Sequence, residues 1–506
     1  MAAAPVWSVD PRTGRQREQV AVEATAEEVD GAVRAAHAAR GALADRTVRA
    51  AYLRAAADLL TESGERVVEA ADAETVLGPT RLAGELARTT AQLRAFADAV
   101  DAGEFLDVRI DHADDGRTPP WPDLRRYKIP LGVVAVYAAS NFPLAFSVPG
   151  GDTASALAAG CPVVVKAHPA HPATSEVCAS VLRRAAAQVG LPEDVLVLVH
   201  GFDAGVELVR HPLVAAAGFT GSVRGGRALF DAAAARPVPI PFHGELGSLN
   251  PVVVTEAAAA ERAEQIGAGL AGSMTLGAGQ FCTKPGFVLV PAGGDGDRLL
   301  KALTEGTSHT EAASMLDLRM REAFVAGVQE RAALPDVETP VTAGAGGEHT
   351  VSAGYLTVPA ARLTAEGPHD QLLEECFGPV TVVARYTSRE EVTAVLSRLP
   401  GNLTATLHTA EADRDGDAAG LLDALVPLAG RVLVDGWPTG VAVAPAQHHG
   451  GPYPATTSTS TSVGITAVER WLRPVSYQSV PDALLPPELR EDNPLGLPRR
   501  VDGRLV

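Results

Sequence analysis

The sequence is poor in cysteine, and the few cysteines that it has are scattered. Its 506 residues contain four, without a CxxC pair: Cys161, Cys178, Cys282 and Cys376. A disulfide framework or a structural zinc site normally needs several cysteines at close and regular spacing. The pattern predicts neither, and we expect no bound metal. It suits a cytoplasmic chain in which one or two thiols carry out chemistry.

Long apolar runs are also absent. The sequence contains no run of about 18 apolar residues, which is the length that a membrane-spanning helix needs. The first residues, MAAAPVWSVDPRTGRQ, lack the apolar core behind a basic leader that marks a secretory signal. These absences favour a cytoplasmic location and argue against a membrane partner.

Positive charge is in short supply. Lysine and arginine number 43 against 61 aspartate and glutamate residues, which gives a net charge of -18. A nucleic-acid partner is therefore not expected, because phosphates need a basic face. The charge says little about a small-molecule substrate. A chain of this length exceeds the roughly 250–300 residues at which single cores stop growing, so two or more domains are expected.

From residue 131 onward, short apolar runs alternate with alanine-rich stretches of helical spacing, whereas the first hundred residues read as helical throughout. Expected strands lie at 132–138, 162–167, 195–199 and 214–219. Expected helices lie at 152–159, at 175–189 with Thr174 as N-cap, and at 204–209. A second α/β series covers 250–433, with a strand at 286–291 and a helix at 390–399. This alternation predicts parallel sheets covered by helices, which bind ligands at the carboxyl ends of their strands.

The segment GAGQFCTKPG places Cys282 between glycine-containing turns. Glycines let a ligand approach the backbone closely, and a nucleophilic thiol needs that access together with N–H groups that hold an oxyanion. A lone cysteine is more often a buried structural thiol. The flanking glycines and the companion motifs favour the nucleophile.

Two further motifs carry polar groups of the right kind. Glu245, in HGELGSLNP, could be a general base, although such a residue is often a surface carboxylate or a partner in a helix cap. Asn141, in AASNFP directly after a strand, could donate to an oxyanion or simply satisfy a turn.

Two motifs suit a nucleotide. FTGSVRGG joins a strand to a helix, the geometry that holds a phosphate at a helix N-terminus, although it is not the GxGxxG fingerprint. Lys166, in VVVKAHP, ends a buried strand on the expected ligand side. Alone it would be a solvated strand end, but beside the glycine loop it is a candidate for the cofactor's ribose or phosphate. A polar, low-complexity loop covers Thr456–Ser462.

In their order and spacing, SNFP, VVVKAHP, FTGS, ELGSLNP, GQFCTKPG and EECFGPV resemble the motifs of the aldehyde dehydrogenase superfamily. RLAGELARTTAQLRAFAD near the N-terminus, with DGWPTGV, HGGPYPATTS and RPVSYQ near the C-terminus, resembles one branch of it. That branch contains α-ketoglutaric semialdehyde (2,5-dioxopentanoate) dehydrogenases and bacterial fatty aldehyde dehydrogenases.

The resemblance implies a role for each matching residue. Cys282 matches the nucleophile, Glu245 the general base and Asn141 the oxyanion ligand. The resemblance also implies a set of residues around the cofactor: Lys166, Gly221, Ser222, Gly226, Glu375 and Phe377. His449 resembles a histidine near the active site of the branch, although its neighbour His448 leaves that choice open.

The implied fold is α/β, with two parallel-sheet domains and an extended oligomerisation arm. Residues 1–106 and 128–245 would form the cofactor-binding domain, 246–470 the catalytic domain, and 107–127 and 471–506 the arms of a homodimer or homotetramer. The segment Pro119–Pro122 and the proline-rich tail suit such arms.

The implied reaction is NAD(P)+-dependent oxidation of an aldehyde, with α-ketoglutaric semialdehyde as the expected substrate. Pro169 stands where NAD-preferring members often carry a glutamate that grips the ribose 2′-OH. Lys166 and His168 would attract a 2′-phosphate, so NADP+ is expected to be preferred, with NAD+ as the alternative. GVAV after Trp437 and Gly244 before the base depart from the branch pattern and weaken the substrate assignment. The alternatives are a fatty or other aldehyde dehydrogenase of the branch and a non-catalytic protein on the same scaffold. A CoA-acylating reductase is disfavoured by Glu245.

Overall fold

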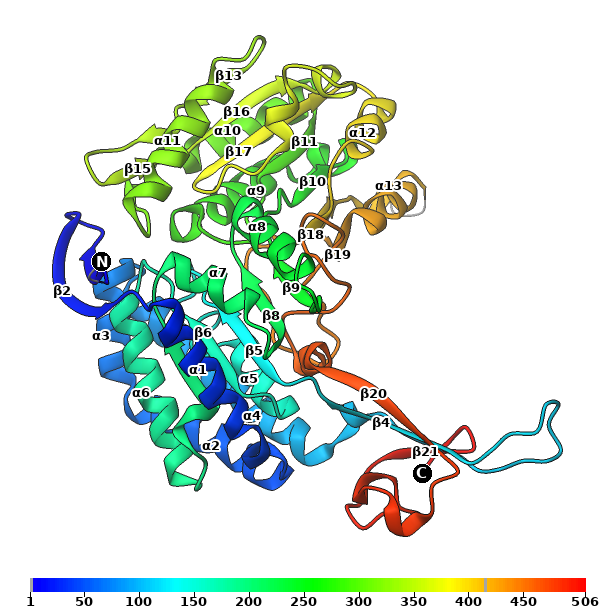
Figure 1. Ribbon diagram of the computed structural model, residues 1–506. Coiled ribbons are helices and arrows are strands. Elements are labelled where there is room, and N and C mark those ends of the chain that lie inside the picture. Colours follow the sequence, from blue (N-terminus) through cyan, green and yellow to red (C-terminus); the bar gives the residue numbers. More distant parts are fainter. Residues whose placement is uncertain (1–2, 414–415) are drawn as a thin grey trace.

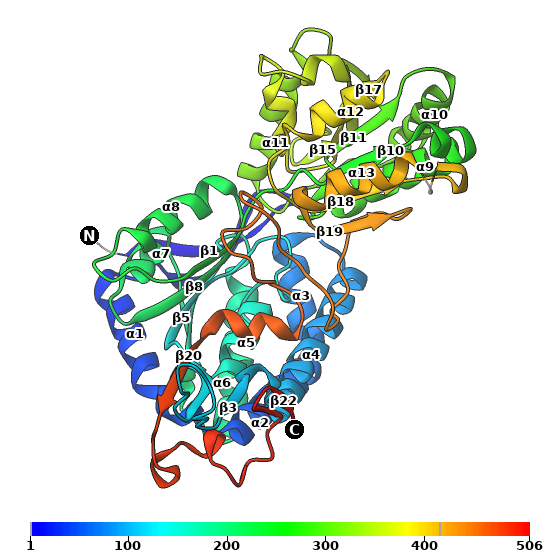
Figure 2. The ribbon, with the colours of Figure 1, turned by 90° about the vertical axis from the view of Figure 1, so that its right-hand side faces the viewer.

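Two β-sheets flanked by helices form the body of the molecule, and a third sheet projects from it as an arm (Figures 1 and 2). The computed structural model describes residues 3–413 and 416–506. Two helix–sheet units and an arm are what the sequence predicts for the fold class, and this prediction is confirmed. The proposed domain boundaries stay a prediction.

The first sheet is wholly parallel, with the strand order β7-β6-β5-β8-β9. Its strands are β5 (Val133–Tyr137), β6 (Val163–Lys166), β7 (Leu196–Val199), β8 (Val214–Thr220) and β9 (Phe242–Glu245). All residues of β5 and β6 are buried. Because helices cover both faces of this sheet, its inner strands read as continuous apolar runs rather than as alternating patterns.

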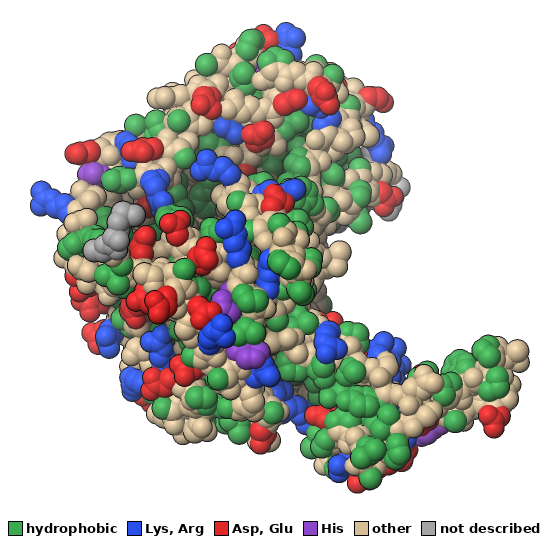
Figure 3. Space-filling model, in the orientation of Figure 1, with side chains coloured by type: hydrophobic (Ala, Val, Ile, Leu, Met, Phe, Trp, Pro, Cys, Tyr) green, Lys and Arg blue, Asp and Glu red, His purple; other side chains and the backbone are tan. Residues whose placement is uncertain are grey.

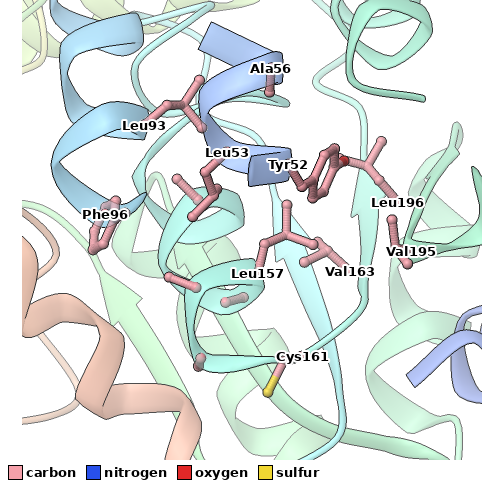
Figure 4. Packing of buried hydrophobic residues seen from close by; sticks show 14 of the residues in the cluster. Tyr52, Leu53, Ala56, Leu93, Phe96, Leu157, Cys161, Val163, Val195 and Leu196 are labelled. Carbon is pink, nitrogen blue, oxygen red and sulfur yellow. The ribbon is translucent and has the colours of Figure 1, made fainter. Parts of the chain in front are cut away.

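Successive residues of β5 point into different cores. Val134 and Val136 belong to one core, and Val133 and Ala135 belong to the other. The first core is formed with α2 (Arg46–Glu62), α4 (Pro79–Ala102), α5 (Gly151–Ala159) and α6 (Pro172–Gln188), and the second with α1 (Ala26–Ala39), α7 (Phe202–Arg210) and α8 (Val223–Ala234). α3 (Gly64–Thr75) packs on α4 and α6. Figure 4 shows the first core, where Tyr52 and Leu53 of α2 face Leu157 and Val163.

The second sheet has the strand order β13-β16-β17-β11-β10-β18-β19, and only its edge strand β13 is antiparallel to its neighbour. Its strands are β10 (Pro251–Val254), β11 (Phe287–Pro291), β13 (Glu338–Val341), β16 (Gly354–Pro359), β17 (Val380–Tyr386), β18 (Asn402–His408) and β19 (Ala429–Val434). Apolar side chains of α9 (Glu256–Thr275) and α10 (Gly294–Ser308) pack in one core beside it. The other core contains side chains of α11 (Leu318–Ala332), α12 (Arg389–Leu396) and α13 (Asp417–Leu425). A small sheet joins β12 (Ala313–Ser314), β15 (Thr350–Ser352) and β14 (Gly344–Ala345).

The arm combines segments that are far apart in the sequence. Its strand order is β20-β4-β3-β21-β22, formed by β3 (Val108–Asp111), β4 (Leu124–Pro130), β20 (Leu472–Gln478), β21 (Arg499–Val501) and β22 (Arg504–Leu505). β4 and β20 pair antiparallel along their whole lengths. Hydrophobic side chains gather on the visible face of the arm near its base (Figure 3), and Leu484 and Leu505 are 73% and 69% exposed.

Two local expectations are wrong. The chain begins with an antiparallel hairpin, β1 (Pro5–Asp10) and β2 (Arg15–Val22), rather than with a helix. Asp10 and Gly14, which has a φ of +65°, close its turn. Thr174 does not cap α6, because the helix already begins at Pro172. The carboxylate of Glu74 accepts the N–H groups of Ala173 and Thr174 from across the core. A buried tertiary partner thus replaces the local cap.

In the part of the chain that the structure describes, no helix combines the length and the apolar character that crossing a membrane would require.

Candidate active site

Cys282 lies in a loop between the short 3-10 turn Leu276–Gly279 and β11. A Cβ on Gly279 would lie 2.4 Å from the backbone of Gly378, so the loop packs too closely there for any larger residue. Asn250 fixes the other side of the loop. Its Nδ2 donates to the carbonyl oxygens of Cys282 and Lys284, at 2.8 and 2.9 Å. The thiol of Cys282 itself stays half-buried and lines a large cleft.

Glu245 ends β9 and is 3% exposed. Its Oε1 lies 3.1 Å from Nε2 of His449, and its Oε2 accepts a hydrogen bond from Oγ of Ser462 at 2.6 Å. Burial alone would raise the pKa of this carboxyl. The charge and hydrogen bond of His449, together with Ser462 and Arg470, outweigh burial and lower the pKa below its usual value. The carboxylate is therefore ionised at neutral pH.

His449 connects the carboxylate to the thiol. Its Nε2 lies 3.6 Å from Sγ of Cys282, so one nitrogen faces both partners. Burial lowers the pKa of His449, but Glu245 and Cys282 outweigh it and raise the pKa to about 10. An imidazolium thus lies between the thiol of Cys282 and the carboxylate of Glu245. Of the two adjacent histidines, it is His449 that makes these contacts.

The donor atoms of Glu245, Cys282 and His449 lie within 4.8 Å of one another. A thiolate, an imidazole and a carboxylate form a set that can bind a cation such as Zn²⁺. A bound metal would occupy the thiol of Cys282. Without a metal, the same three groups suit a nucleophilic thiol with a charged neighbour.

Asn141 follows β5, and its side chain reaches the cysteine loop. Its Nδ2 donates to the carbonyl oxygen of Gln280 at 3.0 Å, and its own carbonyl accepts Nη2 of Arg81 at 2.7 Å. A side-chain amide carries two hydrogens, so the bond to Gln280 uses one and leaves a second donor. Asn141 and Cys282 line the same cleft.

That cleft has a volume of about 1210 Å³ and extends over both halves of the molecule. Most of the predicted cofactor residues line it together with Cys282: Lys166, His168, Gly221, Ser222, Glu375 and Phe377. The N-terminus of α8, with its free N–H groups, suits a pyrophosphate, and the volume suits a dinucleotide. The residues present therefore fit a nicotinamide dinucleotide.

The basic residue that ends β6, Lys166, and the one just after the strand, His168, differ in charge. Lys166 is buried, with Nζ 4.8 Å from the centre of the Phe202 ring, and burial and then Arg319 lower its pKa to about 8. His168 accepts the N–H of Ala170 on Nδ1 at 3.1 Å. Burial, and the charges beside it, bring the pKa of His168 well below its usual value. His168 is therefore neutral, and the charge attraction expected from it is absent.

The three residues of the glycine loop have different roles. Ser222 caps α8 by accepting the N–H of Gly225 at 3.2 Å. Gly221 lines the cleft. Gly226 does not line it: a Cβ there would lie 2.0 Å from Leu246, so this glycine lets α8 pack closely on the segment that follows Glu245.

Glu375 is enclosed beside the glycine-containing turn after Glu245. A Cβ on Gly247 would lie 2.8 Å from Oε2 of Glu375. Burial raises the pKa of Glu375 to about 7, against the charge of Lys284 and a backbone hydrogen bond from Ser248. This carboxyl consequently changes charge near neutral pH.

The family model described as the Aldehyde dehydrogenase family matches residues 2–452. The chain belongs to the aldehyde dehydrogenase family. The predicted enzyme class, oxidation of an aldehyde with NAD(P)+, is thereby confirmed. The dehydrogenase is 48% identical over 462 residues to Alpha-ketoglutaric semialdehyde dehydrogenase 2 of Azospirillum brasilense, covering 90% of this chain and 87% of that one. It is 41% identical to the Alpha-ketoglutaric semialdehyde dehydrogenase of Acinetobacter baylyi, covering 96% and 92%.

A solved structure shows the same fold at low sequence identity. A mutant of Aldehyde dehydrogenase C from Pseudomonas syringae, complexed with NAD+ and octanal, superposes with a TM-score of 0.78. It is 20% identical and covers 95% of each chain. The dehydrogenase therefore has the family fold over nearly its whole length.

Several residues of this aldehyde dehydrogenase site were not found from the sequence. Ser462 comes from the polar loop that carried no chemical signal, and Asn250 was read only as part of the ELGSLNP segment. Arg224 and Arg227 also line the cleft. The two arginines could have been found, because they lie in the FTGSVRGG segment and its helical continuation. Ser462 could not, because its role depends on a contact across 217 residues.

Proposed function

We propose that this dehydrogenase oxidises α-ketoglutaric semialdehyde to α-ketoglutarate through a thioester on Cys282. The cluster of Cys282, His449 and Glu245 carries the covalent mechanism. The two semialdehyde dehydrogenases at 48% and 41% identity support the choice of substrate.

The residues divide the reaction into two covalent steps. The thiolate of Cys282 attacks the aldehyde carbon, and the Asn141 amide and a backbone N–H hold the oxyanion that develops. NAD(P)+, when bound in the cleft, supplies the hydride acceptor. A thioester remains on Sγ, and Glu245 accepts a proton from the water that attacks it. The carboxylate product leaves, and the thiolate is restored.

His449 serves both steps through charge. As an imidazolium it places a positive charge 3.6 Å from Sγ of Cys282 and keeps Glu245 ionised despite its burial. It touches the reacting thiol, so we assign it a catalytic role beside the nucleophile and the base.

We further propose that NADP+ is preferred over NAD+. Pro169 offers no carboxylate to repel a 2′-phosphate, and Lys166 and Arg224 place positive charge on the cleft. Because His168 is neutral, the preference for NADP+ depends on Lys166 and Arg224. Lys166, the loop Gly221–Ser222, Glu375 and Phe377 would hold the dinucleotide, and Gly226 would let the loop and helix pack beside it.

The assembly that we propose is a cytoplasmic homodimer or homotetramer. The apolar surface of the arm supports it, since residues 107–127 and 471–506 carry several large exposed apolar side chains: Trp121, Leu484, Leu495, Leu505 and Val506. We propose residues 1–106 and 128–245 as the cofactor domain, 246–470 as the catalytic domain, and 107–127 and 471–506 as the arms.

A panel of aldehydes tests the function directly. Purified protein, supplied with each nucleotide in turn, should oxidise α-ketoglutaric semialdehyde with a higher kcat/KM than long-chain aldehydes. Cys282→Ala should abolish turnover while retaining nucleotide binding, and Cys178→Ala, at a fully buried thiol, is the matched control. Good turnover of long-chain aldehydes without turnover of the semialdehyde would favour the alternative function, a fatty aldehyde dehydrogenase. Near wild-type turnover of Cys282→Ala would overturn the covalent mechanism.

A further inference from the structure

Three arginines lie close to the catalytic residues, and two of them are already bonded to backbone oxygens. Arg81 donates from Nη2 to the carbonyl of Asn141. Arg431 donates from Nη1 to the carbonyl of Gly440 at 3.0 Å and from Nη2 to that of Pro438 at 2.5 Å. These two guanidinium groups hold the loops of the site in place.

The third, Arg88 on α4, has no such acceptor. Its Nε and Nη2 are buried without a hydrogen-bond partner, and within residues 3–413 and 416–506 it forms no ion pair. Leaving buried guanidinium nitrogens without an acceptor lowers the stability of the fold. A ligand that supplies oxygen acceptors to Nε and Nη2 would offset this cost. The charges of Glu85, Cys282 and Glu245 act on it and partly offset the burial that lowers its pKa.

The rings under Arg88 connect it to residues next to the catalytic ones. Its guanidinium carbon lies 5.8 Å from the ring centre of Phe142 and 5.5 Å from that of Phe146. Phe142 follows Asn141 in the sequence, and its ring packs edge-on to Phe281, the residue before Cys282. The ring of Phe146 lies 6.3 Å from that of His449. Arg88 itself is outside the set of residues that line the nucleotide cleft.

We propose that Arg88 binds the carboxylate end of the substrate and thereby selects a 2-oxo acid aldehyde over an uncharged one. The inference rests on the proposed function, in which the aldehyde carbon reacts at Cys282. Stacking on phenylalanine rings leaves the edge of a guanidinium available for two parallel hydrogen bonds to a carboxylate. The semialdehyde carries that carboxylate four carbon–carbon bonds from the reacting carbon, a span of about 5 Å.

Selectivity between charged and neutral aldehydes is the first test. Arg88→Met keeps the apolar stem on the rings and removes the donors. Its kcat/KM for α-ketoglutaric semialdehyde should fall about 10- to 150-fold, mainly through KM, while that for pentanal stays unchanged. The matched control is Arg94→Met on the same helix, whose side chain is exposed and pairs with Asp58. An equal loss for both aldehydes, or no loss for either, would overturn the proposal.

Alkylation of the thiol tests the site without reference to any aldehyde. Iodoacetate carries a carboxylate and iodoacetamide does not, so the ratio of their rates at Cys282 reports positive charge beside the thiol. This ratio should fall in Arg88→Met and stay unchanged in Arg94→Met. The rates are read on the Cys282 peptide by mass spectrometry, because Cys376 also lines the cleft. An unchanged ratio in Arg88→Met would contradict the anion site.

The two tests separate the two proposals. A wild-type enzyme that prefers pentanal, combined with a changed alkylation ratio in Arg88→Met, would reject the semialdehyde but keep the anion site. Melting temperature and nucleotide binding show whether Arg88→Met is folded. If Arg88→Met is not folded, Arg88→Lys is the second variant. It keeps the positive charge but lacks the paired N–H donors of the guanidinium, so it should lose part of the preference for the carboxylated aldehyde. Full retention of that preference in Arg88→Lys would contradict two-point binding.

Discussion

Replacing His449 by glutamine removes the imidazolium between Cys282 and Glu245, the proposed nucleophile and the proposed base. The side chains of Glu245 and His449 are 3% and 1% exposed, so solvent hardly screens their interaction. Removing one partner of a buried ion pair costs about 3–5 kcal/mol. Glutamine can still donate a hydrogen bond to Glu245, so we expect a loss of about 3 kcal/mol in the free energy of unfolding near pH 6.

The same substitution should raise the pKa of Glu245. Burial is then opposed only by the hydrogen bond from Ser462 and the charge of Arg470. Each unit by which this pKa exceeds the assay pH lowers the ionised fraction of the base about tenfold. Thioester hydrolysis in His449→Gln should therefore shift to higher pH, and alkylation of Cys282 at pH 7 should slow because the thiolate loses its cation.

The pH dependence of stability follows from the two shifts. The raised pKa of His449 means that its contribution is complete below pH 6.5 and is lost as the pH rises through about 10. The lowered pKa of Glu245 means that its contribution is present above about pH 4.5 and is lost as the pH falls through the folded-state value. The difference between wild type and His449→Gln should be largest between these limits and should shrink toward pH 10.

Urea unfolding, stopped-flow bursts and iodoacetamide rates across pH measure these effects. His448→Gln is the control, because His448 is the half-buried neighbour. An alkylation profile in His449→Gln identical to that of the wild type, with the same stability difference at pH 6 and pH 10, would refute the ion-pair argument.

Further expectations concern the base, the cofactor and the arm. Glu245→Gln should keep a rapid burst of NAD(P)H but slow steady turnover, and loss of the burst with a reactive Cys282 would assign Glu245 another role. The cofactor KM should fall as the pH rises through about 7, where Glu375 ionises, and Glu375→Gln should abolish this dependence. The stability of Glu375→Gln relative to wild type should increase as the pH rises from about 4.5 to about 7 and stay constant above that. Pro169→Glu should move kcat/KM from NADP+ toward NAD+, whereas a clear NAD+ preference in the wild type would contradict discrimination by Lys166. Light scattering at micromolar concentration should show a dimer or tetramer, and a monomer would contradict the role of the arm.

The parallel sheets were predictable because burial on both faces leaves continuous apolar strands such as β5 and β6. The hairpin β1–β2 was missed because β2 is mostly exposed and polar, and β1 is a short strand with a single buried residue, Ser8. The false cap at Thr174 has a different cause. A local rule was overridden by Glu74, which is 100 residues away in the sequence.

For the site, motif order selected Cys282, Glu245 and Asn141 as separate candidates. Motif order could not show that a histidine contacts both Cys282 and Glu245. His448 and His449 are adjacent, and only the backbone conformation decides which of them points toward these two residues. The free guanidinium of Arg88 was equally hidden. The segment RLAGELARTTAQLRAFAD that contains Arg88 resembles the branch as a whole and gives no signal for this one residue. Its role emerges only from the rings of Phe142 and Phe146 beneath it.

The contacts of Glu245 have a consequence for biosynthesis. Its two partners, His449 and Ser462, lie 204 and 217 residues further along the chain. At about 5–20 residues per second, a ribosome needs roughly 10–40 s to add them after Glu245. During that time Cys282 has been synthesised without its cation, and the base is without its hydroxyl donor. The nascent chain therefore passes through translation with an unassembled nucleophile, and reactivity toward aldehydes begins only when the last segments are in place.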